Sequence, residues 1–588
     1  MCGIFGCVLK EGSAAPLIIQ GLRRLEYRGY DSIGVSTVHR GEIQIRKDCG
    51  RIDDVSKRVH LGEMRGSVGI GHTRWATHGA PNMINAHPHT DCDGKIALIH
   101  NGVIENFLEL KEELINEGHN FASKTDTEVV AHLIEEELKG DITIGEAFLK
   151  TLRRVKGSYA FVFISSADPK RIYCARNESP LVLGVSEKGT FCASDVPALL
   201  PHTNKVTWLR NGEVAVLSVD GFEITRIEDG SKIERDLTEI TWTLEMAEKQ
   251  GYPHFMLKEI FEQPRVFYET ARTANPAPLV DLLRGTPALT IVACGTSFHA
   301  GLVAKYLLEE CAGIPVRVDH ASEFRYSVPP VRNPVLAVTQ SGETADTLWA
   351  VRAAKSRNCP TVALTNVVGS SVTRLADASI YTRAGPEVGV AATKSFIGQL
   401  AVFMALADQL TGGSLAGSIA NAHLSIGELL QQDVEEAVAV CRRARSIFYV
   451  GRGPFYPVAL EGALKMKEIS YIHAEGYAAG ELKHGPFALL TPETPAIAIC
   501  LPGPTYRVMI SNIKEIKARG APVIGIGLAG DSELADVVDV LLTIPGEDPW
   551  VHVITASVLL QLLAYYTARS LETDIDRPRN LAKSVTVE

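Results

Sequence analysis

The stretch "ALTIVACGTSFHAGLVAKYLLEE" (288–310) has the pattern of an apolar strand, a glycine-containing loop and a helix. The same order follows in "PVLAVTQSGETADTLWAVRAAKSR" (334–357). It continues in the strand-like "PTVALTN" (360–366) and the helical "TKSFIGQLAVFMALADQL" (393–410). Strands that alternate with helices in this way are typical of parallel sheets with crossover helices. We therefore expect α/β structure in this part of the chain.

A second, weaker copy of the pattern lies further along the chain. The stretch "SIFYVGRGPFYPVALEGALKMKEIS" (446–470) matches the first one in register, with Gly453 in the place of Gly295. Two copies of one α/β module, over 256–430 and 431–573, are therefore predicted. Two unrelated doubly wound domains are the alternative.

The first part of the chain, residues 1–235, has a different pattern. Short β-like runs such as "GIFGCV" and "YAFVFIS" are divided by Gly, Asn and Asp turns and interrupted by two helical stretches (15–27 and 125–138). This pattern favours stacked antiparallel sheets flanked by helices. Residues 236–255 break the pattern and are interpreted as a linker, and residues 574–588 form a C-terminal tail.

Composition restricts the class of protein. The 588 residues include 59 Lys and Arg against 69 Asp and Glu, which gives a net charge of -10 and a pI near 6.0. Nucleic-acid binding needs a concentrated basic surface, so no nucleic-acid partner is expected. The 11 cysteines are scattered without a CxxC pair, which argues against a disulfide framework and a structural zinc site. A reducing, cytoplasmic setting fits this pattern.

Neither a signal peptide nor a membrane span is predicted. The N-terminus lacks a basic region followed by an apolar stretch. The most apolar stretch, "SVLLQLLAYYTARSL" (557–571), contains Gln561 and Arg569 and is interpreted as a buried helix.

Two loops of the first α/β module are suited to a phosphate group. "TQSGET" (339–344) lies between a strand and a helix, so Ser341, Thr344 and backbone amides converge where a helix N-terminus favours an anion. "CGTS" (294–297) adds hydroxyls to the same crevice. The sequence has no GxxxxGK[ST] or GxGxxG motif for a nucleotide, so a small phosphorylated metabolite is expected. A plain helix N-cap is the alternative for "SGET".

The second module and the tail supply groups for proton transfer. Glu461, Lys465 and Glu468 share one helix face, a pattern that an exposed salt-bridge ladder also gives. His484 lies in the glycine-bounded "GELKHGP", and Lys583 lies in "LAKS". A carboxylate, an imidazole and an amine are the groups needed to open a sugar hemiketal, hold its carbonyl and move a proton between adjacent carbons.

The N-terminus "MCGIFG" places Cys2 directly after Met1. If Met1 is removed, the α-amine of Cys2 can act as the base for its own thiol, which is an established route to covalent catalysis. Further along the chain, Asn101 and the N–H of Gly102 can form an oxyanion hole.

Arg74 and Asp126 lie in two polar clusters of the first part, "HTRWATHG" (72–79) and "SKTDTE" (123–128). An arginine and an aspartate can receive a carboxylate and an ammonium group, so an amino-acid substrate is predicted. Metal binding is not expected, because no metal motif fits the spacing of the histidines at 72, 78, 87, 89 and 100.

In chain order, these motifs resemble a known family. "MCGIFG", "RRLEYRGYDSIG", "HTRWATHG", "NAHPH", "HNGVIEN" and "TDTEV" resemble the glutaminase domain of the class II, N-terminal-nucleophile amidotransferases, an αββα sandwich. "CGTS", "TQSGETADTL", "GYAAGELKHGP" and "RPRNLAKSVTVE" resemble the two sugar isomerase (SIS) domains of the glutamine:fructose-6-phosphate aminotransferases. The resemblance spans essentially the whole chain.

The resemblance implies a role for each matching residue. In the first part it implies Cys2 as nucleophile with its α-amine as base, Asn101 and Gly102 as oxyanion hole, Arg74, Thr77, His78 and Asp126 as glutamine ligands, and Trp75 as the gate of an ammonia channel. For the sugar phosphate it implies Thr296, Ser297, Gln340, Ser341, Thr344, Val390 and Ala582. For the sugar chemistry it implies Glu468 as proton shuttle, Lys465 as a nearby acid, His484 of a neighbouring subunit as the ring-opening group, and Lys583 as the amine that meets the carbonyl. Ala392 departs from the serine expected in many relatives, which implies a lost hydroxyl contact to the sugar.

The resemblance further implies an enzyme that hydrolyses glutamine, passes ammonia to fructose 6-phosphate and isomerises the product to glucosamine 6-phosphate, the first step of hexosamine synthesis. It implies no metal, nicotinamide or pyridoxal phosphate. A histidine shared between subunits predicts at least a homodimer. The alternatives are a sugar-phosphate-binding regulator with a vestigial catalytic half and an amidotransferase with another acceptor, such as a phosphoribosyl compound.

Overall fold

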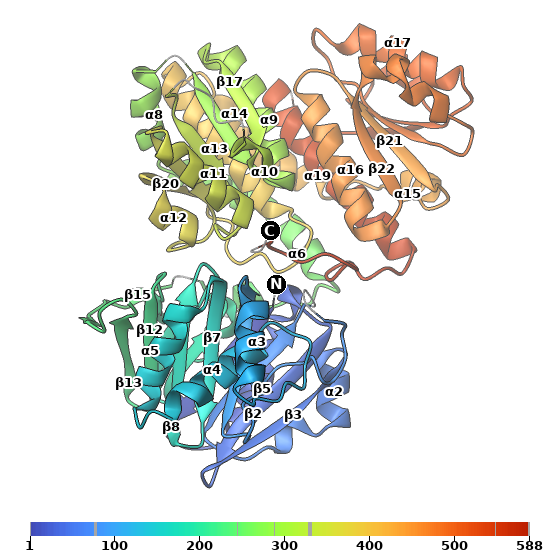
Figure 1. Ribbon diagram of the computed structural model, residues 1–588. Helices are drawn as coiled ribbons and strands as arrows, with labels where there is room; N and C mark the ends of the chain where they lie inside the picture. The colour runs from blue at the N-terminus through green and yellow to red at the C-terminus, as the bar shows by residue number, and fades with distance from the viewer. Residues whose placement is uncertain are drawn as a thin grey trace. The chain divides into compact units, whose positions relative to one another are not determined.

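The computed structural model consists of two compact units, Met1–Ala247 with Ser584–Glu588, and Glu248–Lys583. Figure 1 labels their helices and strands. The structure describes residues 2–75, 79–240, 242–243, 245–286, 288–326, 332–546 and 548–585.

The first unit contains two antiparallel sheets. One sheet has the order β15 (Thr238–Glu239), β11 (Lys205–Trp208), β9 (Val182–Ser186), β10 (Gly189–Ala193), β1 (Gly3–Leu9), β4 (Val68–Arg74), β2 (Ser32–His39), β3 (Glu42–Cys49). The other has the order β14 (Lys232–Ile233), β13 (Gly221–Arg226), β12 (Glu213–Ser218), β8 (Asp168–Asn177), β7 (Gly157–Ser165), β6 (Ile96–Ile104), β5 (His89–Thr90).

Helices cover the outer faces of both sheets (Figure 1). They are α1 (Ala14–Arg23), α2 (Ile52–Arg58), α3 (Phe107–Asn116), α4 (Glu128–Leu138) and α5 (Ile144–Arg154). One core joins α1 and α2 to the first sheet around Phe5, and another joins α4 and α5 to the second sheet around Phe148. A third core lies between the sheets and includes Ile70 and Val162. The predicted αββα layering is confirmed.

The second unit contains two parallel sheets with the same strand order. The first is β17 (Val316–His320), β16 (Leu289–Ala293), β18 (Val335–Val338), β19 (Thr361–Thr365), β20 (Ala378–Tyr381). The second is β22 (His473–Ala478), β21 (Ser446–Gly451), β23 (Ala496–Ile499), β24 (Val523–Gly527), β25 (Val540–Thr543). The turns after β16 and β21 contain Gly295 and Gly453, with φ of 53° and 55°. The shared order confirms the predicted repeat of one α/β module.

Helices of both modules meet in one core. They are α6 (Phe255–Phe261), α7 (Gln263–Thr273), α8 (Ala277–Arg284), α9 (Gly295–Ala312), α13 (Lys394–Thr411), α14 (Ala416–Leu429), α15 (Glu435–Cys441), α16 (Phe455–Ser470) and α19 (Pro549–Ser570). Helices α10 (Ala321–Phe324), α11 (Ala345–Ser356) and α12 (Ser371–Leu375) pack in a separate core on the first parallel sheet, and α17 (Tyr506–Lys517) and α18 (Ser532–Ala535) pack in another on the second. Helix α16 packs against α19 and α9, so elements of the two modules are in direct contact.

Helix α19 is long and apolar enough to cross a membrane by length and composition. However, 94% of its most apolar window is buried inside the unit, where α16, α14 and α15 pack against it. The predicted buried helix over 557–571 is therefore confirmed.

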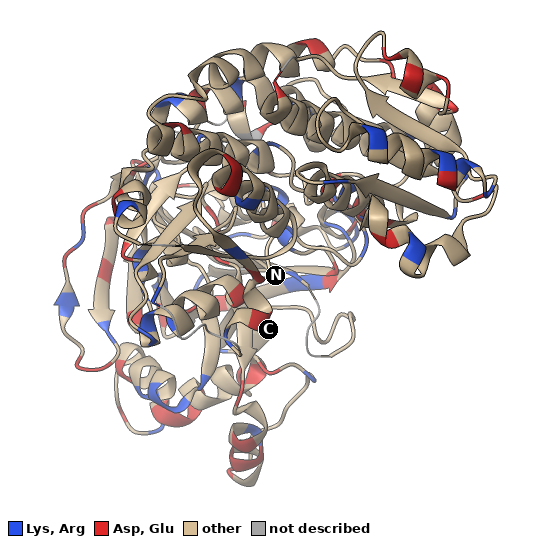
Figure 2. Ribbon diagram, turned by 90° about the horizontal axis from the view of Figure 1, so that it is seen from above, with Lys and Arg blue, Asp and Glu red and all other residues tan. Residues whose placement is uncertain are grey.

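Charged residues of both signs are interspersed along the described chain. Figure 2 shows Lys and Arg positions next to Asp and Glu positions on helices and loops of both units. This mixed distribution differs from the concentrated basic surface that phosphate backbones require.

Gly34 on β2 allows a close approach of two backbone segments. A Cβ atom at this position would lie 2.0 Å from the His87 carbonyl oxygen, and 2.6 Å from Lys47 Cβ. We expect Gly34→Ala to lower the free energy of unfolding by about 1–3 kcal/mol or more, because backbone atoms must move apart. Gly62→Ala is the control, since the atom closest to a Cβ there would be Ile19 Cδ1 at 3.9 Å. Thermal denaturation of the two variants checks this expectation, and equal midpoints would contradict it.

Candidate active site

Cys2 lies directly before β1, where antiparallel pairing with β4 determines its neighbours. Gly3 is opposite Thr73, so the chain that continues from Thr73 through Arg74 to Trp75 runs beside Cys2. The N–H of Trp75 donates to Cys2 Sγ at 3.1 Å, and the N–H of Gly3 donates to Thr73 Oγ1 at 3.2 Å. The strand register therefore provides a backbone donor for the sulfur.

The environment of Cys2 contains some groups that raise the pKa of its thiol and others that lower it. Burial raises the pKa of the thiol above its ordinary value. The positive charge of the amino terminus, the hydrogen bond from Trp75 and the charge of Arg74 act against this rise. Because the protonated thiol is a weak nucleophile, a base close to the sulfur is required for attack.

Strand β6 of the other sheet carries the residues predicted for the oxyanion hole. Asn101 Nδ2 donates to the Cys2 carbonyl oxygen at 2.8 Å. Gly102 follows with φ of 129°, and a Cβ atom there would lie 2.0 Å from the Ser158 carbonyl oxygen. Only glycine fits at this position without displacing the backbone. The structure thus places Asn101 beside Cys2. Gly102 directly follows Asn101, in a backbone conformation that requires glycine.

A buried histidine network orients Asn101. His72 Nε2 lies 3.1 Å from Asn101 Oδ1 and 3.0 Å from the His100 carbonyl oxygen, and its ring stacks on His87 at 4.1 Å between centroids. The rings of His100 and His87 both reach Thr127 Oγ1, at 3.0 and 3.4 Å. Burial lowers the pKa of His72 to about 3 and that of His87 well below its ordinary value. These two rings are therefore neutral near pH 7 and act as hydrogen-bonding supports.

Arg74 and Asp126, the charged residues predicted to bind glutamine, are both buried in this region. Asp126 precedes α4, and its Oδ2 accepts the N–H of Ile104 at 2.8 Å. Burial lowers the pKa of Arg74, while the charges of Cys2, Asp31 and Asp126 oppose the shift. Arg74 is therefore within electrostatic range of both the Cys2 thiol and Asp126.

Trp75, the predicted channel gate, connects the thiol to a second aromatic ring. Its backbone N–H is bonded to Cys2, whereas its ring packs edge-on against Tyr30 with 5.6 Å between centroids. A movement of this segment would change the surroundings of the sulfur. The other predicted glutamine ligands, Thr77 and His78, lie outside the described residues.

In the second unit, the start of α9 and the middle of α16 form a buried polar cluster. Lys465 Nζ donates to Thr296 Oγ1 at 3.0 Å and to Glu468 Oε2 at 2.6 Å. Glu461 accepts the Thr296 hydroxyl at 3.0 Å and lies 2.7 Å from His299 Nδ1. Glu461 and Lys465 are buried, so this helix face is not an exposed salt-bridge ladder. Thr296, Lys465 and Glu468 are predicted site residues, whereas His299 was not predicted.

Lys465 is charged in this cluster despite its burial. Burial alone would lower the pKa of the ammonium group, but the charges of Glu461 and Glu468 outweigh it and raise the pKa. An ammonium group that is held beside a carboxylate and a hydroxyl can donate a hydrogen bond to a substrate oxygen.

The loop between β18 and α11 contains the residues predicted to bind phosphate. Ser341 Oγ accepts the N–H of Glu343 at 3.2 Å, and Thr344 Oγ1 lies 3.1 Å from Thr339 Oγ1. Gln340 lies in the same loop, directly after β18 and Thr339. Hydroxyls and backbone amides therefore meet at the N-terminus of α11, which is a favourable position for an anion.

Ser297, a predicted sugar-phosphate ligand, contacts a residue that was not predicted. Its hydroxyl accepts Gln399 Nε2 at 2.9 Å from α13. Gln399 is buried, and its Oε1 has no hydrogen-bond partner among the described atoms. A buried amide oxygen without a partner is costly, and a ligand hydroxyl can satisfy it. No local motif marks Gln399, because it lies in an apolar helix far from Ser297 in the sequence.

Lys583 in the tail forms a buried ion pair that was not predicted. Its Nζ donates to Glu387 Oε2 at 2.5 Å, and the two side chains are 4% and 0% exposed. The N–H groups of Thr393 and Ser395 also donate to Glu387, each at 3.0 Å. Burial alone would raise the pKa of the Glu387 carboxyl, but Lys583 and these amides lower it to about 2. Glu387 is therefore ionised and fixes the amine.

The remaining predicted residues lie in the tail and nearby loops. The N–H of Val390 donates to the Asp576 carbonyl oxygen at 3.2 Å, which ties the tail to the loop after Glu387. Ala582 lies next to Lys583 and is half-buried. His484 ends a short helical turn, η5 (Ala479–His484), and is exposed.

Two family models match this chain. The glutamine amidotransferase domain matches residues 72–201, and the SIS domain matches twice, over 282–408 and 441–570. The fold agrees with these matches. The antiparallel unit has a cysteine directly before β1, and the parallel unit has two copies of one module. The class defined by fold and site is thus a glutamine amidotransferase joined to two SIS domains.

Full-length relatives identify the family. The chain is 49% identical to a glutamine--fructose-6-phosphate aminotransferase (isomerizing) of Thermococcus kodakarensis and 48% identical to one of Methanothermobacter thermautotrophicus, with 100% of both chains covered in each case. This protein belongs to the family of glutamine--fructose-6-phosphate aminotransferases (isomerizing). The solved C-terminal domain of glucosamine-fructose-6-phosphate aminotransferase from Francisella tularensis is 35% identical, with a TM-score of 0.52, and covers 56% of this chain and 100% of its own.

The Glu387–Lys583 pair predicts an acid-sensitive second unit. The pKa of Glu387 is about 2 in the folded chain against an ordinary value of 4.5. A carboxyl group with a lowered pKa contributes stability above its unfolded pKa, and this contribution is lost as the pH falls through the folded value. Between pH 6 and pH 4 we expect this group to account for a loss of about 1 kcal/mol.

The measurement is urea unfolding of the full chain at pH 6 and pH 4. Glu387→Gln should be less stable at pH 6 and should lose about 1 kcal/mol less than the original chain on acidification. Glu493→Gln, at an exposed position, is the control and should keep the original pH dependence. Identical pH dependences for all three proteins would contradict the expectation.

Proposed function

We propose that this chain converts glutamine and fructose 6-phosphate into glutamate and glucosamine 6-phosphate. The observation that carries the proposal is the pairing of two sites in one chain. In one unit Cys2 Sγ accepts the Trp75 N–H at 3.1 Å beside Asn101, and in the other Lys583 is held on Glu387 at 2.5 Å. The names of the full-length relatives state a glutamine-dependent amino transfer to this sugar phosphate with isomerisation.

Glutamine hydrolysis takes place at Cys2 in this proposal. Once Met1 is removed, the α-amine takes the thiol proton and the sulfur attacks the side-chain amide carbon of glutamine. Asn101 Nδ2 and the Gly102 N–H stabilise the oxyanion, ammonia leaves, and water cleaves the thioester to give glutamate. The hydrogen bond from His72 keeps the Asn101 amide in the orientation that the oxyanion needs.

The glutamine backbone is bound by opposite charges. Arg74 pairs with the substrate carboxylate and Asp126 with its ammonium group, assisted by Thr77 and His78. Burial supports this assignment, because charged side chains that are withdrawn from water are strongly stabilised by a charged ligand.

Ammonia passes from the first unit to the sugar within the protein. Trp75 gates this passage in our proposal, because its backbone contacts the Cys2 sulfur while its ring packs on Tyr30. The thioester and the gate can therefore respond to each other.

The sugar phosphate is bound by the first SIS module and the tail. The phosphate lies at the N-terminus of α11, and the hydroxyls and amides of the two loops hold the sugar. The residues assigned to this binding are Thr296, Ser297, Gln340, Ser341, Thr344, Val390 and Ala582. Gln399 is added to them, since its buried Oε1 can accept a sugar hydroxyl.

In the sugar chemistry, the Lys583 amine and the Glu468 carboxylate act in different steps. His484 opens the ring by moving a proton from the anomeric hydroxyl to the ring oxygen. Lys583 Nζ then forms a C=N bond at C2 with loss of water, and ammonia replaces the lysine. Glu468 takes a proton from C1 and returns one to C2, so that C1 becomes the aldehyde of glucosamine 6-phosphate. Lys465, at 2.6 Å from Glu468, donates to the sugar oxygen.

We further propose that the active protein is at least a homodimer in a reducing, cytoplasmic setting. His484 is exposed in the single chain, which suits a residue that completes the sugar site of a neighbouring subunit. All 11 cysteines are free, as expected where thiols stay reduced.

Replacement of the nucleophile separates the two halves of the reaction. We expect Cys2→Ala to abolish glucosamine 6-phosphate formation from glutamine, by at least about 10³-fold, while synthesis from added ammonium is retained. Cys7→Ala is the matched control, because Cys7 is a buried cysteine on β1, the strand that directly follows Cys2. Product assays with each nitrogen source provide the measurement, and mass spectrometry of the chain determines whether Met1 is removed. Glutamine-dependent synthesis by Cys2→Ala would refute the proposal.

Mixing of subunits tests the shared histidine. His484→Ala and Glu468→Gln should each be inactive in synthesis from fructose 6-phosphate. When the two are mixed and refolded, mixed dimers should regain part of the activity, since one of their two sites then combines an intact His484 with an intact Glu468. Each variant refolded alone is the control. No recovery in the mixture, with mixed dimers demonstrated by mass, would contradict the shared site.

A further inference from the structure

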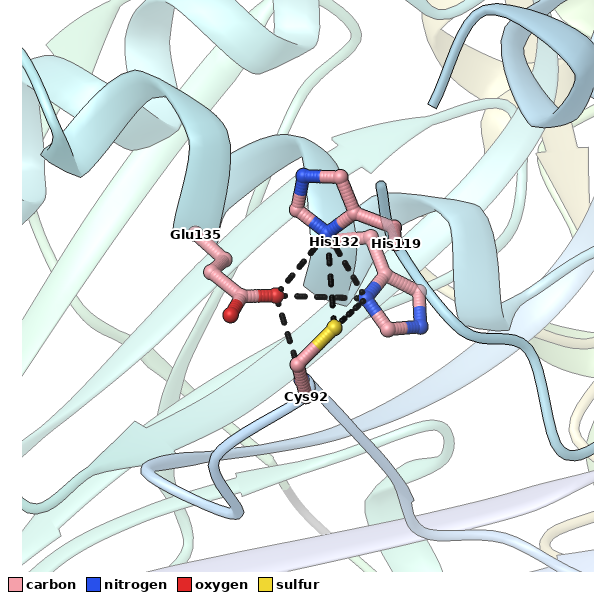
Figure 3. A group of neighbouring side chains, drawn as sticks. All are labelled: Cys92, His119, His132 and Glu135. Atoms are coloured by element: carbon pink, nitrogen blue, oxygen red, sulfur yellow. Dashed lines mark hydrogen bonds and ion pairs between the residues drawn. The ribbon is translucent and has the colours of Figure 1, made fainter. Parts of the chain in front are cut away.

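A cluster of metal-binding side chains lies in the first unit, outside the proposed glutamine site. Cys92 lies in the turn between β5 and β6, His119 follows α3, and His132 and Glu135 lie one turn apart on α4. Figure 3 shows the four side chains pointing toward one common centre. One ligand atom of each residue lies within 4.8 Å of the others.

The separations of these atoms match a tetrahedron around zinc. The Nδ1 atoms of His119 and His132 are 3.3 Å apart, and Cys92 Sγ lies 3.6 and 3.5 Å from them. Glu135 Oε2 lies 3.1 and 3.2 Å from the same two nitrogens. A tetrahedral site with Zn–N near 2.05 Å and Zn–S near 2.3 Å requires about 3.4 Å between nitrogens and about 3.5 Å between nitrogen and sulfur.

Four possible ligand atoms face one another at the centre of this cluster. His119 Nε2 lies 2.8 Å from Glu136 Oε2 and donates to that carboxylate, so its Nδ1 is the ring atom that faces Glu135 Oε2 and His132 Nδ1. The two histidine side chains are 3% and 1% exposed, so bulk water does not separate these atoms. A cation at the centre would be bound by all four atoms.

The outer partners of the two histidines also fit a metal site. The nitrogen of each ring that faces away from the centre is turned toward a carboxylate, Glu136 at 2.8 Å from His119 Nε2 and Glu128 at 3.7 Å from His132 Nε2. Carboxylates in this position orient metal-bound imidazoles and make them more basic. The backbone N–H of Cys92 donates to Glu135 Oε2 at 3.1 Å, which brings the turn against α4.

We propose that Cys92, His119, His132 and Glu135 bind one zinc ion in a closed structural site. Four protein ligands leave no open position for a substrate, and a thiolate with two imidazoles selects zinc over magnesium or calcium. This site goes beyond the proposed function, which uses no metal. It also departs from the sequence-based expectation of no metal, which rested on the absence of CxxC pairs and on the spacing of the histidines at 72, 78, 87, 89 and 100.

The zinc ion would join three segments, which are the turn after β5, the connection before α4, and α4 itself. Glu128, beside His132, accepts the backbone N–H groups of Ala122 and Ser123 at 2.7 and 2.6 Å. Glu128 therefore holds the connection from His119 to α4 on its α4 side, and the zinc ion would hold it at His119. Since Asp126 lies in this connection, the metal would hold the segment that carries it.

Metal content of the purified full chain tests the site. After incubation with zinc and removal of excess metal, elemental analysis should find one zinc per chain in the original protein and at least about fivefold less in Cys92→Ser and Glu135→Gln. Glu63→Gln is the matched control, because Glu63 also lies three residues after a histidine, with 3.2 Å to His60 Nδ1, but both are exposed and no described cysteine completes a cluster with them. This control should keep one zinc per chain.

Cobalt provides a second readout that does not depend on activity. Metal-free original protein should take up one Co²⁺ per chain with a thiolate-to-cobalt charge-transfer absorption, and Cys92→Ser should lack that absorption. If Cys92→Ser does not fold, the original protein and Glu135→Gln decide the outcome. Less than about a tenth of an equivalent of zinc in the original protein, or equal zinc in Cys92→Ser, would overturn the proposal.

Discussion

The antiparallel register of β1 against β4 is the constraint on which the first site depends. It places Gly3 opposite Thr73, and in this way brings the N–H of Trp75 to the sulfur of Cys2. A shift of one residue would turn every side chain of β1 to the opposite face of the sheet. Since both faces of this strand are buried, the packing of two separate cores resists such a shift.

The second site depends on buried charged side chains, whose removal from water costs free energy. The side chains of Lys583, Glu387, Lys465 and Glu461 are almost entirely buried, and that of Glu468, which pairs with Lys465, is 20% exposed. Pairs of this kind contribute little net stability, because desolvation offsets their attraction, and the loss of one partner is strongly destabilising. Their retention is understandable if a substrate with oxygen atoms and a phosphate group takes over part of these interactions.

Sequence patterns were sufficient to predict the fold and the site residues that lie in local motifs. The alternation of strands and helices predicted the parallel unit. Local motifs also marked Thr296, Lys465 and Glu468, which the structure brings together in one cluster. Glu387 and Gln399 were missed because their partners lie far away in the sequence, in the tail and in α9. The four proposed zinc ligands were missed for the same reason. Only the chain's three-dimensional course brings Cys92 to His119 and α4, and no spacing rule describes it.

The shared strand order of the two SIS modules has an evolutionary consequence. The contact between Thr296 on α9 and Glu461 and Lys465 on α16 joins equivalent helices of the two copies. Neither copy contains this contact alone, so it requires two modules packed against each other. After duplication, the first copy can be selected for hydroxyl-rich loops and the second for an ionised helix, without one segment having to satisfy both demands.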